Sequence, residues 1–347
     1  MKVANFSVSV LTVTYNRAHV LHRVYESLNR QKTRDFEWVV VDDGSTDDTP
    51  ALLARWQAEA DFSITWFRYS NNRGKPAAIN AGRTIVSGDY TLMLDSDDAL
   101  IDDAMETIAA WRTKTNIDTI PDAGILAFRC LDELGNTVGR LKNGNSHFDQ
   151  SPIIMHGRKA RYELGINFEC ALVYKTKVFF ETSALELDNL EHVPARVWEP
   201  ILECYEVIYI DFPIRIYYRH DGVARLSDSL SKRVKWPRGR YLRALFVLNH
   251  ENAYFLKDPK AFLNAARKVT RLGLHLGRSP RRQFRDLANG RARLLWLAGM
   301  PGGCFGYLRD RLRGRTAPKA DRNIAAWGPA APPEKPELHP PPGRFQK

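Results

Sequence analysis

The sequence lacks the features that mark several large classes of protein. Its four cysteines, Cys130, Cys170, Cys204 and Cys304, lie far apart and form no CxxC pair. Isolated cysteines of this kind predict neither a zinc site nor a disulfide scaffold, so we expect a reducing compartment. No apolar run approaches the ~18 residues of a membrane span, and the N-terminal residues lack the cleavage site of a signal peptide. A cytoplasmic protein is therefore expected.

A glycine-rich phosphate-binding loop is also missing. The first predicted strand ends in Thr14-Tyr15-Asn16-Arg17, which has no glycine where a dinucleotide-binding Rossmann fold or a nucleotidyltransferase needs one. No Walker A sequence occurs anywhere in the chain. A nucleotide would therefore have to be held by a metal and by basic side chains.

Charge is distributed unevenly along the 347 residues, whose net charge is +11. Residues 1–231 contain 25 Lys and Arg against 33 Asp and Glu, whereas residues 232–315 contain 21 against 4. The second segment is helical in pattern and predicts an anionic partner, either a membrane surface or a polyanion. Residues 316–347 contain eight prolines and no periodicity, so we expect a disordered Pro-rich tail.

Strand and helix patterns alternate in the first hundred residues. Apolar runs at residues 7–14, 36–41, 64–69 and 90–94 predict strands, and amphipathic stretches between them predict helices. This alternation indicates an α/β fold with a mainly parallel sheet. Further strands are expected at residues 123–131, 170–174, 207–210 and 214–218, and a short helix at 196–204. Ligands of such sheets bind beyond the carboxyl ends of the strands.

An acidic cluster follows the strand at residues 90–94. Asp95, Asp97 and Asp98 would repel one another unless a cation lay between them. Mg²⁺ and Mn²⁺ prefer oxygen ligands, and Mg²⁺ is commonly held by one or two carboxylates together with substrate phosphates. The cluster therefore predicts a metal site that holds a diphosphate. An acidic turn before a helix is the alternative interpretation.

Two other polar turns fall at the same predicted edge. Arg73 and Lys75 precede a helix, where they could contact phosphates or remain solvated loop charges. Asp42 and Asp43 could accept hydrogen bonds from a ribose or a base, or form only a turn before a helix.

Four motifs in order resemble one enzyme family. TVTYNR, VVVDDGSTDDT, NNRGKPAAINAG and DYTLMLDSDD, spread over residues 8–103, resemble the nucleotide-sugar-binding half of family 2 glycosyltransferases. The resemblance implies a GT-A fold, which is a Rossmann-like, mainly parallel sheet flanked by helices. Residues 1–103 would then bind the donor, and residues 104–231 would bind the acceptor. It also implies a nucleotide-diphosphate sugar donor, Mn²⁺ or Mg²⁺, and inversion at the anomeric carbon.

The resemblance also assigns roles to individual residues. Thr14 and Tyr15 would line the nucleoside pocket, and Asp43, with Asp42, would contact the base or ribose. Either of the basic pair Arg73 and Lys75 would lie near the diphosphate or the base.

The same resemblance implies different roles for the three aspartates of the acidic cluster. Asp95 would face the ribose and the metal, Asp97 would ligate the metal, and Asp98 could replace either. His220 follows the last predicted strand, where some GT-A enzymes place a third metal ligand. It could equally be a polar loop residue.

Transfer to a sugar hydroxyl requires a carboxylate base. Glu199 in VWEPILEC occupies a position similar to the base of one bacterial branch of the family, although the residue order differs. Glu203 lies one helical turn away and is the second candidate. Both could also be surface residues of a helix. Glu169, in NFECALVY, matches a family position near the acceptor.

The basic segment has two main interpretations. Leucines at 272, 274 and 276 and the run at 294–297 are interleaved with arginines, as in helices that lie on anionic membranes. Alternatively, these helices pack on the catalytic domain with a solvated basic face. Nucleic-acid binding is not expected, because no recognition module is present.

Together with the resemblance, the sequence predicts a metal-dependent inverting glycosyltransferase whose acceptor is a glycan or a lipid-linked molecule. On family grounds alone, the resemblance implies a place in surface polysaccharide synthesis, at the inner face of the membrane. A catalytically silent nucleotide-sugar-binding or scaffold protein is the alternative from a different functional class, and a nucleotidyltransferase is the alternative enzyme.

Overall fold

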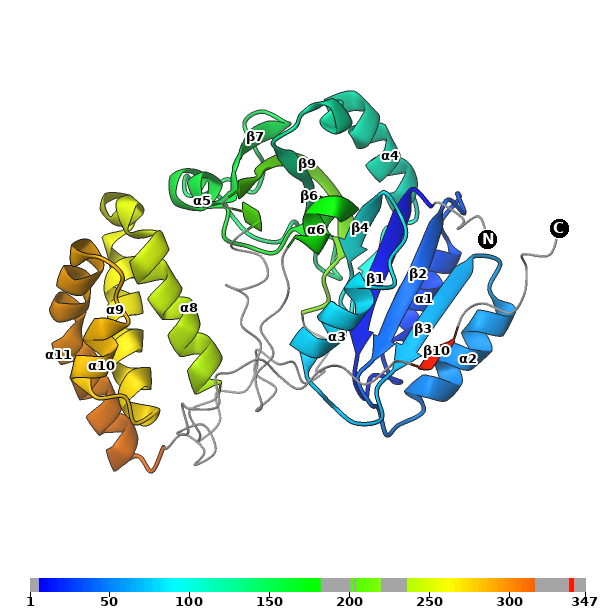
Figure 1. The fold of residues 1–347 in the computed structure, drawn as a ribbon. Helices are drawn as coiled ribbons and strands as arrows, with labels where there is room; N and C mark the ends of the chain where they lie inside the picture. The colour runs from blue at the N-terminus through cyan, green and yellow to red at the C-terminus, as the bar shows by residue number, and fades with distance from the viewer. Residues whose placement is uncertain (1–5, 182–200, 203, 220–235, 316–336, 340–347) are drawn as a thin grey trace. The chain divides into compact units, whose positions relative to one another are not determined.

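The computed structural model describes residues 6–181, 201–202, 204–219, 236–315 and 337–339. The chain divides into two compact units. The first comprises Met1–Ala184, Pro200–Gly222 and Pro332–Lys347, and the second comprises Leu185–Glu199 and Val223–Ala331. The first unit contains the sheet, and the described part of the second is helical (Figure 1). The boundary expected between residues 231 and 232 lies in a stretch that the structure does not describe.

Four parallel strands form the first half of the sheet. They are β1 (Val8–Thr14), β2 (Phe36–Asp42), β3 (Ser63–Arg68) and β4 (Tyr90–Met93), in the order β3-β2-β1-β4. β1 and β2 are buried along their whole length, as expected of Val-rich strands covered on both faces. The predicted alternation and its parallel sheet are confirmed, and the carboxyl ends of all four strands lie at one edge.

The second half of the sheet has mixed directions. β8 (Ala171–Lys175) runs antiparallel to both β4 and β6 (Ala123–Leu131), and β9 (Glu206–Ile216) runs parallel to β6. It follows that β6 and β9 point the same way as β1 to β4, so that their carboxyl ends reach the same edge. Two short strands, β5 (Ala99–Leu100) and β7 (Ile153–His156), pair antiparallel with β9.

β9 differs from the sequence prediction, which had separate strands at residues 207–210 and 214–218. Pro213, which lies between the two predicted strands, cannot donate a ladder hydrogen bond. In the structure Pro213 lies opposite Arg129, where the register between β6 and β9 shifts. A β-bulge leaves one residue of the strand out of the regular hydrogen-bond ladder. The strand therefore continues past the proline to Ile216.

Helices pack on the two faces of the sheet. Alternate residues of a strand point to opposite faces, and Val8 and Val10 of β1 belong to the core cluster that includes residues of α1 (His22–Asn29), α2 (Thr49–Glu59) and α4 (Ala104–Thr115). Leu11 points the other way, toward α3 (Lys75–Arg83), where its side chain lies against Gly82. The sheet therefore lies between two layers of helices, one formed by α1, α2 and α4 and the other by α3. Short helical segments complete the unit at Ile117–Thr119, Gly157–Lys159, Ala160–Leu164 and Thr176–Phe180.

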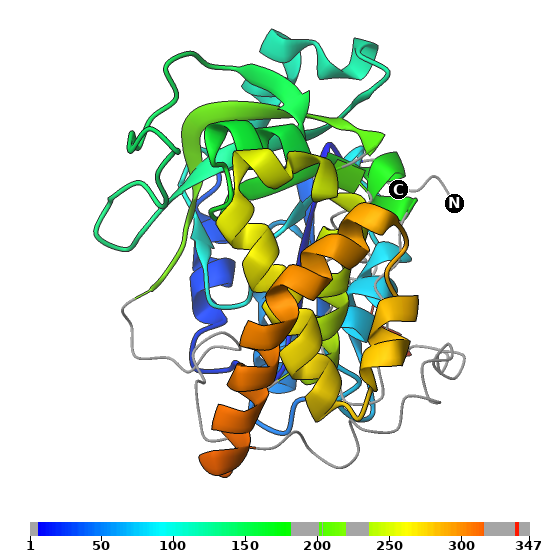
Figure 2. The same cartoon turned by 90° about the vertical axis from the view of Figure 1, so that its left-hand side faces the viewer.

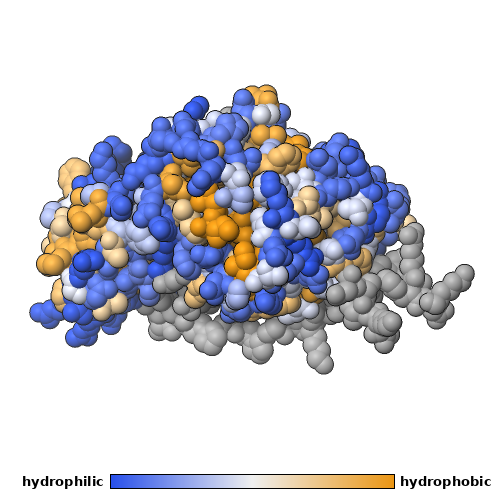
Figure 3. Space-filling model, turned by 90° about the horizontal axis from the view of Figure 1, so that it is seen from above, coloured by the Kyte–Doolittle hydropathy of each residue, from blue (hydrophilic) through white to orange (hydrophobic). Residues whose placement is uncertain are grey.

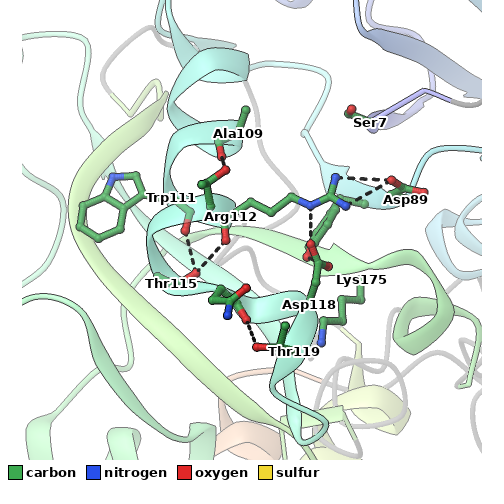
Figure 4. Close-up of polar contacts among 12 residues, drawn as sticks. Ser7, Asp89, Ala109, Trp111, Arg112, Thr115, Asp118, Thr119 and Lys175 are labelled. Carbon is green, nitrogen blue, oxygen red and sulfur yellow. Dashed lines mark hydrogen bonds and ion pairs between the residues drawn. The ribbon is translucent and has the colours of Figure 1, made fainter.

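An ion-pair cluster joins α4 to the start of β4. Figure 4 shows the Arg112 guanidinium reaching Asp118 at 2.7 Å and Asp89 at 3.4 Å. The Tyr90 hydroxyl also donates to Asp118, at 2.6 Å. These partly exposed groups lie at the amino end of β4, opposite the edge at which the strands end.

The second unit is a small bundle of helices. It contains α8 (Pro237–His250), the 3-10 segment Asn252–Lys257, α9 (Pro259–His275), α10 (Pro280–Arg285) and α11 (Gly290–Leu312). Figure 2 shows α11, in orange, crossing α9, in yellow. Glycines make this close approach possible, because a Cβ at Gly303 would lie only 2.4 Å from the Cβ of Thr270. No described helix has the length and apolar character needed to cross a bilayer.

A short strand, β10 (Glu337–His339), pairs antiparallel with β3. This differs from the disordered tail predicted for residues 316–347, because three residues of that segment have regular structure. β3 lies at the end of the parallel set and offers unpaired backbone groups along its outer side, which a passing extended segment can satisfy. The rest of the predicted tail lies outside the described residues.

Candidate functional site

Asp43 fixes the loop that precedes α3. Its backbone amide donates to the carbonyl of Thr14 at 2.8 Å, and its carboxylate accepts from the amides of Arg73 (2.8 Å) and Gly74 (2.7 Å). Gly74 has φ +91, a conformation that other residues rarely adopt. The ends of β1 and β2 and the loop before α3 are thereby tied together at one point.

The carboxyl group of Asp43 is expected to titrate abnormally. Burial raises its pKa to about 6, against the opposing effect of the two backbone donors. The folded state then binds this proton more tightly than the unfolded chain does. As pH rises from about 4 to about 6, Asp43 therefore lowers the free energy of unfolding, by at most about 1.4 kcal/mol per pH unit. Urea unfolding of the wild type and of Asp43→Asn across this range measures the effect. Equal slopes for the two proteins would contradict it.

Asp42 and Thr14 are buried at neighbouring strand ends. One carboxylate oxygen of Asp42 accepts from the Ser45 amide at 3.0 Å, and the other lies 3.4 Å from Nε of Arg68. Burial raises the pKa of Asp42. Oδ2 of Asp42 and Oγ1 of Thr14 have no hydrogen-bond partner within the structure. Buried polar atoms are normally satisfied, so these two oxygens are available to a ligand's donor groups.

The turn after β1 is joined to the turn after β2. The Asn16 amide donates to Oγ of Ser45 at 2.8 Å, and the Asn16 side-chain oxygen accepts from the Thr46 amide at 2.7 Å. Asn16 has φ +53, which asparagine tolerates better than most residues. Tyr15, which precedes it, is left partly exposed. The turn predicted to line a nucleoside pocket is therefore rigid, with one aromatic ring at the surface.

Two cations hold the acidic cluster. Nζ of Lys75 lies 2.8 Å from Oδ1 of Asp95, and Nη2 of Arg215 lies 2.9 Å from Oδ2 of Asp95. Arg215 also donates to Asp98, through Nε at 2.7 Å and through Nη2. The Tyr218 amide donates to the second oxygen of Asp98 at 3.2 Å. Lys75, from the start of α3, and Arg215, from the end of β9, thus converge on the residues that follow β4.

The ionisation of these groups follows from their neighbours. The Lys75 ammonium holds the pKa of Asp95 well below its usual range, with Arg215 acting in the same direction against burial. Burial would lower the pKa of Lys75, but the attraction of Asp95 outweighs it and the pKa is raised. Burial raises the pKa of Asp98 to about 7, although the Arg215 guanidinium opposes this. Asp95 and Lys75 are therefore both charged at neutral pH.

Asp97 lies between these two aspartates and is partly exposed. Its charge acts on both Lys75 and Asp98, so it lies close to them. Its backbone carbonyl accepts from the Arg23 guanidinium at 3.2 Å, and Arg23 in turn stacks on the ring of Tyr218 at 4.1 Å. The peptide that carries Asp97 is thereby fixed from α1 and from the end of β9.

The three carboxylates do not form a ready-made metal cage. Asp98 is fully buried, and both of its oxygens are in use: one binds Arg215 and the other accepts from the Tyr218 amide. A metal role for Asp98 stays a prediction. Both oxygens of Asp95 are engaged by cations. Among the described residues, no group of three or more His, Cys, Asp or Glu side chains is placed to hold a metal ion. A divalent cation fits here only with Asp97 as its main protein ligand and with phosphate oxygens completing its shell.

Other predicted site residues fall in different places. Arg73 lies over the ring of Tyr69 at 4.8 Å, beside the loop that Asp43 anchors. Glu169 is exposed, and its charge acts on Arg215 and Cys130, which places it near the same edge. Glu199, Glu203 and His220 lie outside the described residues, as does most of the helix predicted at residues 196–204.

Sequence reasoning missed Arg215 and Arg23. Arg215 interrupts the apolar run Ile214-Arg215-Ile216 in a buried strand. A charged side chain in such a position requires a partner, and this requirement was a usable signal. Its partners lie 117 and 120 residues away in the sequence, however, and nothing in the pattern identified them.

Comparison with known proteins identifies the family to which most of the site residues belong. Residues 9–137 match the sequence profile described as glycosyl transferase family 2. This stretch is a family 2 glycosyltransferase domain. Of the described residues placed at the site, it lacks Glu169 and also Arg215 and Tyr218, which come from β9 and the turn after it.

Two relatives named for sugar transfer match this chain over about a hundred residues each. The GalNAc(5)-diNAcBac-PP-undecaprenol beta-1,3-glucosyltransferase of Campylobacter jejuni is 31% identical over 100 residues, which are 29% of this chain and 32% of that protein. Abequosyltransferase RfbV of Salmonella typhimurium is 31% identical over 106 residues, 30% of this chain and 32% of its own length. The chain thus spans about a third of the length of these curated relatives.

A solved structure extends the likeness beyond the family 2 domain. The structure of Staphylococcus aureus TarS, residues 1–349, in complex with UDP-GlcNAc aligns with a TM-score of 0.56 at 18% identity, over 89% of this chain and 93% of that one. The likeness concerns the fold, and it confirms the α/β architecture of GT-A type.

Proposed function

We propose that the protein is an inverting glycosyltransferase that moves a sugar from a nucleotide-diphosphate donor to a glycan or a lipid-linked acceptor, in surface polysaccharide synthesis. The observation that carries the proposal is the placement of Lys75, Asp95 and Asp97 together at the carboxyl edge of a family 2 domain. Two relatives named for sugar transfer, one of them to an undecaprenol-linked glycan, support the reaction class.

The donor's nucleoside would bind where β1 and β2 end. Oγ1 of Thr14 and Oδ2 of Asp42 are buried and make no hydrogen bond within the structure, so they can accept hydrogen bonds from a base or ribose. Oδ2 of Asp42 also lies 3.4 Å from Nε of Arg68. Tyr15 offers a ring face at the same turn. Asp43 acts mainly by fixing the loop, because both of its oxygens accept backbone amides.

The diphosphate would bind beside Lys75 and Arg73. The carboxylates of Asp95 and Asp97 already offset much of the positive charge of Lys75 and Arg215. A bound diphosphate would therefore add negative charge that calls for a further cation. Developing charge on a leaving group is best stabilised by cations already in place. Lys75 is such a cation, because its ammonium is already held in position by the carboxylate of Asp95.

A divalent cation, Mn²⁺ or Mg²⁺, would be held with the donor, through Asp97 and the donor's phosphates, and would act as a Lewis acid on the leaving diphosphate. Asp95 would orient toward the ribose while its oxygens keep Lys75 and Arg215 in place. His220 remains a proposed additional ligand. Binding of the metal is therefore expected to depend on the nucleotide.

The base that accepts the proton of the attacking hydroxyl is proposed to be Glu199, with Glu203 as the second candidate. A single base on the face opposite the leaving diphosphate gives direct displacement with inversion. Glu169 is exposed near the same edge and would contact the acceptor. A lipid-linked acceptor would be met at the inner face of the membrane, where the basic helical unit would hold the enzyme.

Nucleotide sugars screened by thermal shift, with and without Mn²⁺, test the proposal, because a ligand raises stability according to its affinity. Asp97→Ala is expected to abolish metal-dependent donor binding, whereas Glu199→Gln should keep binding and lose transfer. Full activity of Glu199→Gln would overturn the choice of base. Binding without transfer to any glycan or lipid-linked acceptor would favour a nucleotide-sugar-binding protein instead.

A further inference from the structure

α11 exposes a line of large apolar side chains. Leu294, Leu297, Phe305, Leu308 and Leu312 are between 47% and 89% exposed. With about 100° between successive residues, their directions fall within an arc of about 80° on the helix. We call these five residues the α11 stripe. Single exposed leucines are ordinary, but five in line on one helix mark an interaction surface.

The stripe is distinct from the face of α11 that stabilises the bundle. The opposite face is buried and includes Ala292, Leu295, Trp296, Gly299 and Gly303. It packs against α9, where glycines allow close contact. Apolar surface on the helical unit is visible at the left-hand end of Figure 3. α11 is therefore apolar on two faces, of which only one has a partner within the bundle.

Sequence pattern alone did not separate these faces. Leu272, Leu276, Leu295 and Trp296 were grouped with a membrane-facing set, but all four are buried in the bundle. Of the residues named in that prediction, only Leu294 and Leu297 belong to the stripe. The helices pack on one another and leave an apolar face exposed. Contact with a membrane and packing on the catalytic domain both stay predictions.

Arginines flank the stripe on both sides. At the same angular spacing, Arg291 and Arg309 lie about 40° beyond one border of the stripe, and Arg293 and Arg311 lie about 40° beyond the other. The only acidic residue of α11, Asp310, is buried and bound to Arg271 at 2.5 Å and to His275 at 3.1 Å. The stripe therefore has basic borders and no exposed acid on its helix.

Among the described residues of the bundle, the other acidic side chains offset little of this positive charge. Glu251 is buried and pairs with Arg243, and Asp286 pairs with Arg278 and the Tyr241 hydroxyl. Asp258 is exposed, but it caps α9. The bundle thus presents mainly cations to an approaching partner.

We propose that the α11 stripe and its flanking arginines bind an anionic lipid bilayer, with the helix lying in the plane of the surface. An apolar centre with guanidinium borders suits the boundary between acyl chains and negatively charged headgroups. The helix has 23 residues and would be about 34 Å long, with arginines at both ends, so it lies on the bilayer rather than across it.

A second copy of the chain fits this surface less well. Apposing two stripes would place arginine borders against arginine borders, and like charges at an interface are costly. A nucleic acid would satisfy the arginines but would leave the leucines and phenylalanine in water. Only a partner that is both anionic and apolar matches both parts of the surface.

Sedimentation of the full chain with lipid vesicles tests the proposal. The wild type should bind phosphatidylcholine vesicles that contain about 30 mol% phosphatidylglycerol and bind vesicles of phosphatidylcholine alone much less. The double variant Phe305→Ser/Leu308→Ser should bind at least about tenfold more weakly, because two large apolar groups no longer enter the bilayer. Arg291→Gln/Arg309→Gln should reduce the preference for anionic vesicles and its sensitivity to salt.

The matched control is Leu134→Ser in the first unit, whose leucine is 75% exposed; it should leave vesicle binding unchanged. All variants alter exposed residues, so unchanged melting temperatures are expected. The proposal is overturned if the wild type does not bind anionic vesicles or if Leu134→Ser weakens binding as much as the stripe variant. It is also overturned if the stripe variant only converts an oligomer to a monomer in gel filtration while vesicle binding persists.

Discussion

Replacing Arg215 with methionine should destabilise the first unit by about 3–5 kcal/mol, the usual cost of removing one member of a buried ion pair. The Arg215 and Asp98 side chains are 5% and 1% exposed. Without the guanidinium, Asp98 keeps one backbone donor, the Tyr218 amide, and loses the cation that opposes the effect of burial on its pKa. The comparison is therefore made above pH 7, where the wild-type carboxyl is charged and its loss of a cation costs most. Urea unfolding monitored by tryptophan fluorescence measures the loss.

Two further variants make this test specific. Arg112→Met removes the partly exposed pairs of α4 with Asp89 and Asp118 and should cost less than about 1 kcal/mol. Adding Asp98→Asn to Arg215→Met should recover much of the lost stability, because no charge then remains buried. If Arg215→Met were no more destabilising than Arg112→Met, the pair would not be the structural element described here.

The largest effect on activity is expected from Lys75→Met. The Lys75 ammonium is held by Asp95 at the proposed diphosphate position, and its loss leaves the developing charge of the leaving group less stabilised. Loss of one such preorganised donor typically lowers kcat by about 10²–10³. We expect a fall of that size in kcat/KM for sugar transfer. It would be measured with the donor that the thermal-shift screen identifies.

Nucleotide binding separates this role from a merely structural one. Lys75→Met should weaken binding of the nucleoside diphosphate strongly and binding of the matching nucleoside little, because only the former carries phosphates. Lys32→Met, which alters an exposed lysine of the same unit, should change neither. Equal weakening of nucleoside and nucleoside diphosphate would show that Lys75 supports the fold of the pocket instead of contacting phosphate.

Local patterns in the sequence predicted the fold of residues 1–103 well. Val-rich β1 and β2 alternate with helices that begin at recognisable proline positions, such as Pro50 and Pro76, so strand direction and the site edge followed from them. The loop before α3 was placed correctly. The hydrogen bonds that anchor this loop to Asp43 were not predicted. They involve two backbone amides 30 and 31 residues away, and backbone amides cannot be recognised from the pattern of side chains.

Features that depend on long-range pairing could not be predicted in this way. β9 was divided at Pro213, since the bulge that accommodates this proline exists only against β6. The bond between Asp98 and Arg215 was not predicted, because neither this bond nor the burial of Asp98 is visible in the run Asp95–Asp98. Leu294 and Leu295 are neighbours with the same side chain, and only the crossing of α11 over α9 decides which of them is exposed.

The bond from Arg215 to the residues after β4 also limits how chains of this fold can be recombined. Asp95 and Asp98 belong to residues 1–103, whereas Arg215 lies in β9, more than a hundred residues further along the chain. A hybrid that joined residues 1–103 to the following part of a relative without an arginine at this position would carry a buried carboxylate without its cation. Such an exchange should therefore succeed only when this arginine is transplanted with its strand.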